Sequence, residues 1–206
     1  MIKKMMKAAV VAALALAGTA QADTIDFSNI GSMGYLNVAN TLIIPGTYTE
    51  DGYQLSAGGH FLAALASATE DNGIAWAGSE ALTAVPLSTV TLSRVDNTAF
   101  DLYSIDLVRL KSFLGGGNSV TFTGHLSGGG TVEQELVIGT DFSWDTYTFN
   151  GFNNLSSVTF GQPLNPFHLY QFDNINVAAV PEPETYGMLL GGLGLLGFLA
   201  RRRKQG

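Results

Sequence analysis

Short runs rich in Val, Thr, Phe and Tyr, broken by Gly and Asn, fill the chain from residue 23 onward. In NSVTFTGHL (118–126), apolar residues alternate with threonines; after a triple-glycine turn, TVEQELVIG (131–139) alternates again. A period of two is typical of strands buried on one face, and glycine suits the tight turn between them. The pattern predicts a hairpin with Glu133 and Glu135 on its outer face.

The run FDLYSIDLVRL (100–110) is apolar at positions of both faces and predicts a strand between two layers. Further strands are expected at 24–28, 48–55, 88–94, 146–150, 157–161 and 169–177. About nine short strands with regular turn signals are typical of an all-β fold, and we expect an antiparallel β-sandwich or jelly roll. Residues 58–76 fit either a helical turn or a strand and a loop.

The N-terminus has the three parts of a secretory signal peptide. Three lysines come first, an apolar run covers residues 8–17, and Ala20 and Ala22 place small residues at the two positions that signal peptidase reads. We expect cleavage after Ala22. The chain then divides into a signal peptide (1–22), a β-domain (23–178) and a C-terminal segment (179–206).

The C-terminal segment begins with Pro181, Glu182 and Pro183 and continues with an uncharged, glycine-rich stretch at 185–200. As a helix this stretch is about 24 Å long, against about 30 Å for the hydrocarbon core of a bilayer. A basic cluster follows, made of Arg201, Arg202, Arg203 and Lys204. We expect a short transmembrane helix that stays in the inner membrane transiently, with its basic end in the cytoplasm.

Charge separates the β-domain from the two ends. Between residues 23 and 180 there are three basic and fifteen acidic residues, a balance of −12, whereas the whole chain carries −7. So acidic a domain is not expected to bind nucleic acid, because phosphate contacts need cations. Neutral ligands such as sugars, and divalent cations, fit this charge. The absence of cysteine excludes thiol, zinc–thiolate and iron–sulfur chemistry.

The sequence offers little for catalysis. Its three histidines show no metal-ligand spacing, and no G-x-S-x-G motif is present. We therefore do not expect an enzyme. Asp26, Asp106 and Asp173 lie in apolar runs, where a carboxylate is costly unless it is bonded or binds a metal. A structural Ca²⁺ site using Asp26 and Asp173 is one hypothesis; the alternative is that each aspartate faces solvent or caps a turn. No other cofactor is expected.

Aromatic residues are frequent at 142–152, and sugars stack on exposed aromatic rings. Trp76 and Trp144 stand beside small and polar residues, so we expect these two to be the best candidates for ligand contact. The alternative is that most aromatic residues of this stretch belong to the core.

The order Pro-Glu-Pro, short glycine-rich span and terminal basic cluster closely resembles the PEP-CTERM sorting signal of Gram-negative bacteria. The resemblance implies recognition of Pro181, Glu182 and Pro183 by an exosortase, cleavage near that motif, and delivery to the cell surface or extracellular matrix, often alongside exopolysaccharide. More loosely, FDLYSIDL (100–107) and QFDNINV (171–177) resemble galactose-binding-like β-sandwich domains. In that family a late-strand Asp can ligate calcium, and Asp173 fits the position.

These observations favour an exported, non-catalytic surface or matrix protein that binds glycan or exopolysaccharide. A structural or adhesive matrix protein, assembling through protein–protein contacts, is the alternative. A polysaccharide hydrolase is the least supported interpretation.

Overall fold

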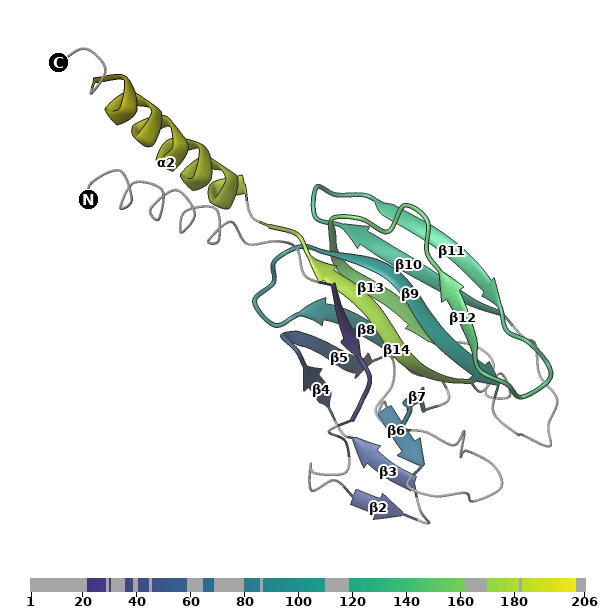
Figure 1. The fold of residues 1–206 in the computed structure, drawn as a ribbon. Helices are drawn as coiled ribbons and strands as arrows, with labels where there is room; N and C mark the ends of the chain where they lie inside the picture. Colours follow the sequence, from purple (N-terminus) through teal and green to yellow (C-terminus); the bar gives the residue numbers. More distant parts are fainter. Residues whose placement is uncertain are drawn as a thin grey trace. The chain divides into compact units, whose positions relative to one another are not determined.

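The structure is a computed structural model that describes residues 22–28, 30, 36–38, 41–44, 46–58, 65–68, 80–85, 87–109, 119–161, 170–181 and 183–202. The described residues contain fourteen strands and one helix (Figure 1). The strands are β1 (Ala22–Ile25), β2 (Leu36–Val38), β3 (Thr41–Ile44), β4 (Thr47–Glu50), β5 (Tyr53–Gly58), β6 (Leu65–Ala68), β7 (Thr83–Ala84), β8 (Thr89–Arg94), β9 (Phe100–Arg109), β10 (Ser119–Leu126), β11 (Thr131–Val137), β12 (Asp145–Thr148), β13 (Leu155–Gly161) and β14 (Tyr170–Ala179). The helix is α2 (Pro183–Arg202).

Ten antiparallel strands of the compact unit Ala22–Ala179 form one sheet that folds back on itself. One layer has the order β1-β14-β9-β12, and the other has the order β4-β5-β8-β13-β10-β11. The pairing of Leu155 on β13 with Phe100 on β9 joins the two layers. The expected all-β antiparallel architecture is therefore confirmed, and the sheet is nearly a closed barrel.

A second sheet has the order β2-β3-β6-β7. It meets the first layer through Leu82, whose backbone N–H donates to the Phe172 carbonyl at 3.0 Å and whose carbonyl accepts from the Phe172 N–H at 2.8 Å. The Thr83 hydroxyl also donates to the Tyr170 carbonyl at 2.7 Å. These bonds attach the small sheet to β14.

Aromatic rings fill the space between the two layers. Phe172 of β14 meets Phe160 of β13 edge to face, with ring centroids 5.2 Å apart, and Phe100 of β9 meets Tyr53 of β5 at 5.7 Å. All four side chains are buried. Such pairs stabilise a core beyond the area that they bury, and here they fix the spacing of the layers.

The predicted hairpin is confirmed: β10 pairs with β11, and Glu133 and Glu135 are exposed while Leu136 is buried. The expectation of one strand over 48–55 is wrong. A turn at Asp51 and Gly52, both in the left-handed region with φ of 48° and 80°, splits it into β4 and β5. The count of about nine strands was too low, chiefly because the short strands of the second sheet were missed. Of residues 58–76, Leu65–Ala68 form the strand β6, so Leu65 and Ala66 follow the strand alternative and not the helical turn; residues 59–64 and 69–76 lie outside the described residues.

Helix α2 begins at Pro183, a residue that suits the first helical position because its missing N–H has no partner there in any case. Leu190 and Leu195 are exposed along it. Within the described part of the chain, no helix combines the length and the hydrophobicity needed to cross a bilayer. The expected helix is thus present, without support for its transmembrane character.

Candidate functional site

The outer side of the layer β1-β14-β9-β12 carries a set of polar side chains, most of which hydrogen-bond to another member of the set. We call it the polar face. Strand pairing places its members on β1, β14, β9 and β12 beside each other, and Asp26 follows β1. They are Thr24, Asp26, Asp101, Tyr103, Ser104, Asp106, Thr146, Asn174 and Asn176.

Hydrogen bonds connect all four strands of this layer. Thr24 donates to Asn176 Oδ1 at 2.7 Å, and Asn176 Nδ2 donates to Ser104 Oγ at 2.8 Å. Asp106 accepts at both carboxylate oxygens, from Asn174 Nδ2 at 2.9 Å and from Thr146 Oγ1 at 2.6 Å. Bonds to a charged acceptor are stronger than neutral ones. The network therefore holds these side chains in fixed positions on an outward-facing surface.

A bulge in β14 produces this arrangement. The register between β14 and β9 shifts between Asp173 and Asn176, and Asn174 has a left-handed φ of 47°. Asn tolerates that conformation better than most residues. Its backbone N–H donates to Asp173 Oδ1 at 2.7 Å, while its side-chain amide reaches Asp106. Bulges are over-represented where a sheet redirects a side chain toward a site.

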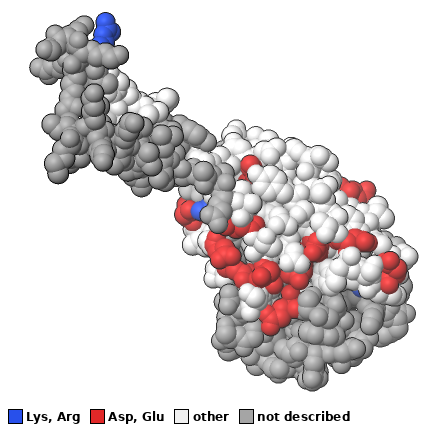
Figure 2. Space-filling view, in the orientation of Figure 1, with Lys and Arg blue, Asp and Glu red and all other residues white. Residues whose placement is uncertain are grey.

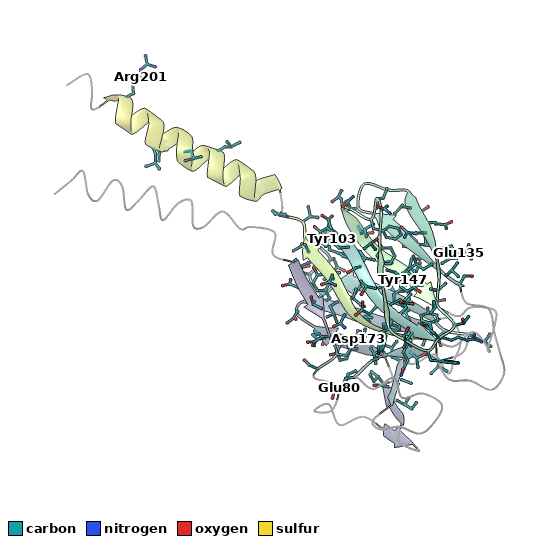
Figure 3. The ribbon with its side chains drawn as sticks, turned by 45° about the vertical axis from the view of Figure 1, so that its right-hand side comes forward. Glu80, Tyr103, Glu135, Tyr147, Asp173 and Arg201 are labelled. Carbon is teal, nitrogen blue, oxygen red and sulfur yellow. The ribbon has the colours of Figure 1, made fainter. Side chains whose placement is uncertain are left out.

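Tyr103 supplies an aromatic ring on the same face. It is 44% exposed, and its hydroxyl lies 3.4 Å from Asp101 Oδ2. Asp101 is held in turn by the backbone N–H of Asn154 at 2.7 Å. Desolvation, followed by the Asp101 carboxylate, raises the pKa of the Tyr103 hydroxyl, which is thus protonated at neutral pH. Figure 3 labels Tyr103 on β9 and Asp173 on β14.

The side of the β unit turned to the viewer is acidic. Figure 2 shows Asp and Glu side chains as a band across it. Asp26 and Asp106 contribute carboxylates to the polar face. An acidic surface disfavours polyanionic ligands and accepts neutral ones.

The two proposed calcium ligands occupy different settings. Asp26 is exposed after β1, and the N–H of Ser28, 3.0 Å from Asp26 Oδ1, lowers its pKa. Asp173 is buried and pairs across the strands with Asp106. Within the described ranges, no group of three His, Asp or Glu side chains is placed to hold a metal. The calcium hypothesis stays a prediction, which thermal melting with and without EDTA can test.

The aromatic candidates divide as follows. Phe149 and Phe152 are buried in the core, as expected for most of this stretch, while Trp144 is half-buried before β12. Phe142 is 45% exposed, and the Arg109 guanidinium lies 5.9 Å from its ring centroid. Trp76 lies outside the described residues.

The described terminal segments contain some of the predicted processing residues. Ala22 is exposed in β1 and pairs with Ala178; Ala20 lies outside the described residues. Pro181 precedes α2, Pro183 begins it and Arg201 is exposed near its end. Glu182, Arg203 and Lys204 lie outside the described residues, and so does the side chain of Arg202.

The sequence singled out Asp26 and Asp106 of the polar face, but its other members were missed. Asn174 and Asn176 alternate with apolar residues in QFDNINV, and Tyr103 stands three residues before Asp106 in FDLYSID. Amides and hydroxyls within otherwise apolar strands were the available signal. Glu50 was also missed as a buried acid: its Oε2 accepts from the Phe27 N–H at 3.0 Å, and desolvation raises its pKa.

Comparison with known proteins gives a clear result for the tail. The PEP-CTERM protein-sorting motif matches residues 179–204, so the chain carries this sorting motif at its C-terminus. No curated protein matches the chain.

The body is similar to solved family 29 carbohydrate-binding modules. A CBM29-2 variant complexed with mannohexaose is 11% identical, with a TM-score of 0.44 over 78% of this chain and 93% of that one. A family 29 module is 13% identical, with a TM-score of 0.36 over 69% of this chain and 90% of that one. Likeness at this level carries no conclusion about ligands.

Proposed function

We propose that this chain is an exported, exosortase-sorted protein whose polar face binds a neutral extracellular glycan without catalysis. The observation that carries the proposal is the bonded network on the polar face, with the Tyr103 ring exposed beside it. Fixed polar groups next to an aromatic ring are what a sugar needs from a protein surface.

The chemistry of the polar face suits sugar hydroxyls. Each hydroxyl can donate and accept, and the face offers amide, hydroxyl and carboxylate groups in one layer. Because these groups are already oriented by Asn174, Asn176 and Asp106, binding costs less side-chain ordering. The Tyr103 ring can stack on the apolar face of a pyranose. The acidic balance of the domain favours neutral sugars over uronic-acid polymers.

Binding to a panel of neutral and uronic-acid bacterial polysaccharides, with the full chain immobilised, tests the proposal. Tyr103→Ala should lose binding to the neutral polymers. The matched variant Tyr103→Phe keeps the ring and should retain most of it. A loss of binding in Trp144→Ala would show that the contact surface extends beyond β12. Equal binding by Tyr103→Ala and the wild type, or preference for the acidic polymers, would overturn the proposal.

The tail supports export to the surface of a Gram-negative cell. We infer that signal peptidase cuts after Ala22 and that an exosortase recognises Pro181, Glu182 and Pro183 after a transient hold at the inner membrane. Mass spectrometry of the protein isolated from its native cells tests this. An intact Arg201–Gly206 terminus would contradict processing, and replacement of the three motif residues by alanine should leave the tail attached.

A structural or adhesive role is the second candidate. Among the described strands, β4 pairs on one side only, with β5. Exposed edges of this kind can pair with other chains. Self-association without glycan binding would favour this role. The carboxylates Glu133 and Glu135 lie on the exposed side of β11, which gives the hydrolase interpretation no support.

A further inference from the structure

The two layers of the β unit each end at an edge strand on the same side of the fold (Figure 1). Among the described strands, β11 pairs only with β10 and β12 pairs only with β9. No backbone hydrogen bond between β11 and β12 is found in this part of the chain. Their facing backbone groups thus need other partners.

Gln134 supplies partners from the β11 side. Its Nε2 donates to the Thr148 carbonyl at 2.9 Å, and its Oε1 accepts from the Asn150 N–H at 3.1 Å. These two backbone groups flank Phe149, and both point away from β9, so one side-chain amide satisfies a donor and an acceptor on the open edge of this segment. The side-chain amide therefore takes the place of a missing strand.

Tyr147 does the same from the β12 side. Its hydroxyl donates to the Val137 carbonyl at 3.0 Å and accepts from the Gly139 N–H at 3.2 Å, again two residues apart. Burial raises the pKa of this hydroxyl, so it is protonated at neutral pH and can both donate and accept. The ring is partly buried and packs against the core, which fixes its direction. Each edge thus holds the other through one side chain (Figure 3, Tyr147).

We propose that Gln134 and Tyr147 form a reciprocal clasp that closes the β11–β12 seam and prevents these edges from pairing with a second copy of the chain. Unpaired edge strands associate with one another unless something blocks them. β11 has seven residues and ends at the exposed Val137, so it is long enough to pair once the clasp opens. The partner of the opened seam is another copy of this chain, because the same edge is then free on both.

The test uses Gln134→Ala, Tyr147→Phe and the double variant in the full chain. Hydrogen exchange of the Asn150 amide should accelerate in the first and that of the Gly139 amide in the second, each about fivefold, as expected for loss of one hydrogen bond of about 1 kcal/mol. The double variant should form oligomers whose mass rises with concentration in light scattering, at concentrations where the wild type shows no such rise. Glu135→Ala, on the same strand, and Tyr103→Phe are controls and should match the wild type.

The proposal is overturned if the two amides exchange at the wild-type rate. It is equally overturned if they exchange faster and the double variant keeps the wild-type mass at every concentration, or if the controls associate as strongly. Should the double variant fail to fold, Tyr147→Phe alone decides by the same two readouts, because it keeps the packed ring.

Discussion

The two outer faces of the β unit are both polar, but they are built differently. On the second layer, short contacts link side chains of regularly paired strands: Gln54 donates to Ser93 at 3.0 Å, and His125 lies 3.2 Å from Thr159. Its one register shift lies at the end of β10. The polar face instead has a bulge, a left-handed Asn174 and a carboxylate with two donors.

This difference indicates where a functional site lies. Apart from the end of β10, the strands of the second layer pair in regular register. Strained backbone persists only where the surroundings hold it, and it gathers at functional sites. The irregular polar face therefore carries the binding proposal.

The largest effect is expected from a change to the second layer that leaves the polar face untouched. In Gly161→Ala, the new Cβ would lie 2.5 Å from the Ser88 carbonyl oxygen, and the φ of 153° disfavours a side chain. The free energy of unfolding in urea should fall by about 3 kcal/mol. Gly58→Ala, whose Cβ meets nothing within 4 Å, is the control. Equal stability of the two variants would show that the β13–β8 contact is looser than described.

Removing the central carboxylate of the polar face should weaken binding. Asp106→Ala leaves Asn174 and Thr146 without their acceptor, so the network loses its orientation. Affinity for the bound polysaccharide, measured by calorimetry, should fall at least tenfold, or about 1.4 kcal/mol. Glu133→Ala on the second face should change affinity less than twofold. If both variants bind equally well, the comparison between the faces does not hold.

The bulge can be separated from the amide that it carries. Asn174→Gly keeps the left-handed backbone and removes the bond to Asp106, which should cost about 1 kcal/mol of stability. Asn174→Ala adds the cost of a left-handed alanine and should cost about 2 kcal/mol. Thermal unfolding measures both. Identical losses would mean that φ at this position carries no strain.

The smallest expected effect concerns pH and Glu50. Desolvation raises the pKa of Glu50 above its usual 4.5, so the folded state binds its proton more tightly than the unfolded state does. In the wild type, the contribution of Glu50 to the free energy of unfolding is complete below pH 4.5, and it is lost as the pH rises through the folded-state pKa. The free energy of unfolding of Glu50→Gln should therefore exceed that of the wild type by less than about 1 kcal/mol at pH 7, and the two should be equal at pH 4 or below. Urea unfolding at both pH values measures this difference. A variant that is more stable than the wild type at pH 4 but not at pH 7 would contradict the prediction.

Much of the fold was predictable because apolar and polar residues alternate along the long strands. The β10–β11 hairpin follows from its period of two, and its inward and outward residues are confirmed. The second sheet was not predicted, because strands of two to four residues carry no period. The β4–β5 hairpin carried an Asp-Gly signal at 51–52 that was available and missed.

The site was less predictable than the fold. Asp173 was singled out from its apolar surroundings, and it is indeed buried. The register shift next to it turns Asn174 outward. No periodicity shows such a shift, because it depends on pairing with β9. The residues that make the polar face come from four strands far apart in sequence, so only the sheet brings them together.

Hydrogen-exchange mass spectrometry of the full chain, with and without the polysaccharide identified in the binding panel, locates the binding surface. We expect slower exchange in peptides from β9 and β14 on binding, and unchanged exchange in β10 and β11. Slower exchange confined to β10 and β11, or no change in any strand despite measurable binding, would contradict it.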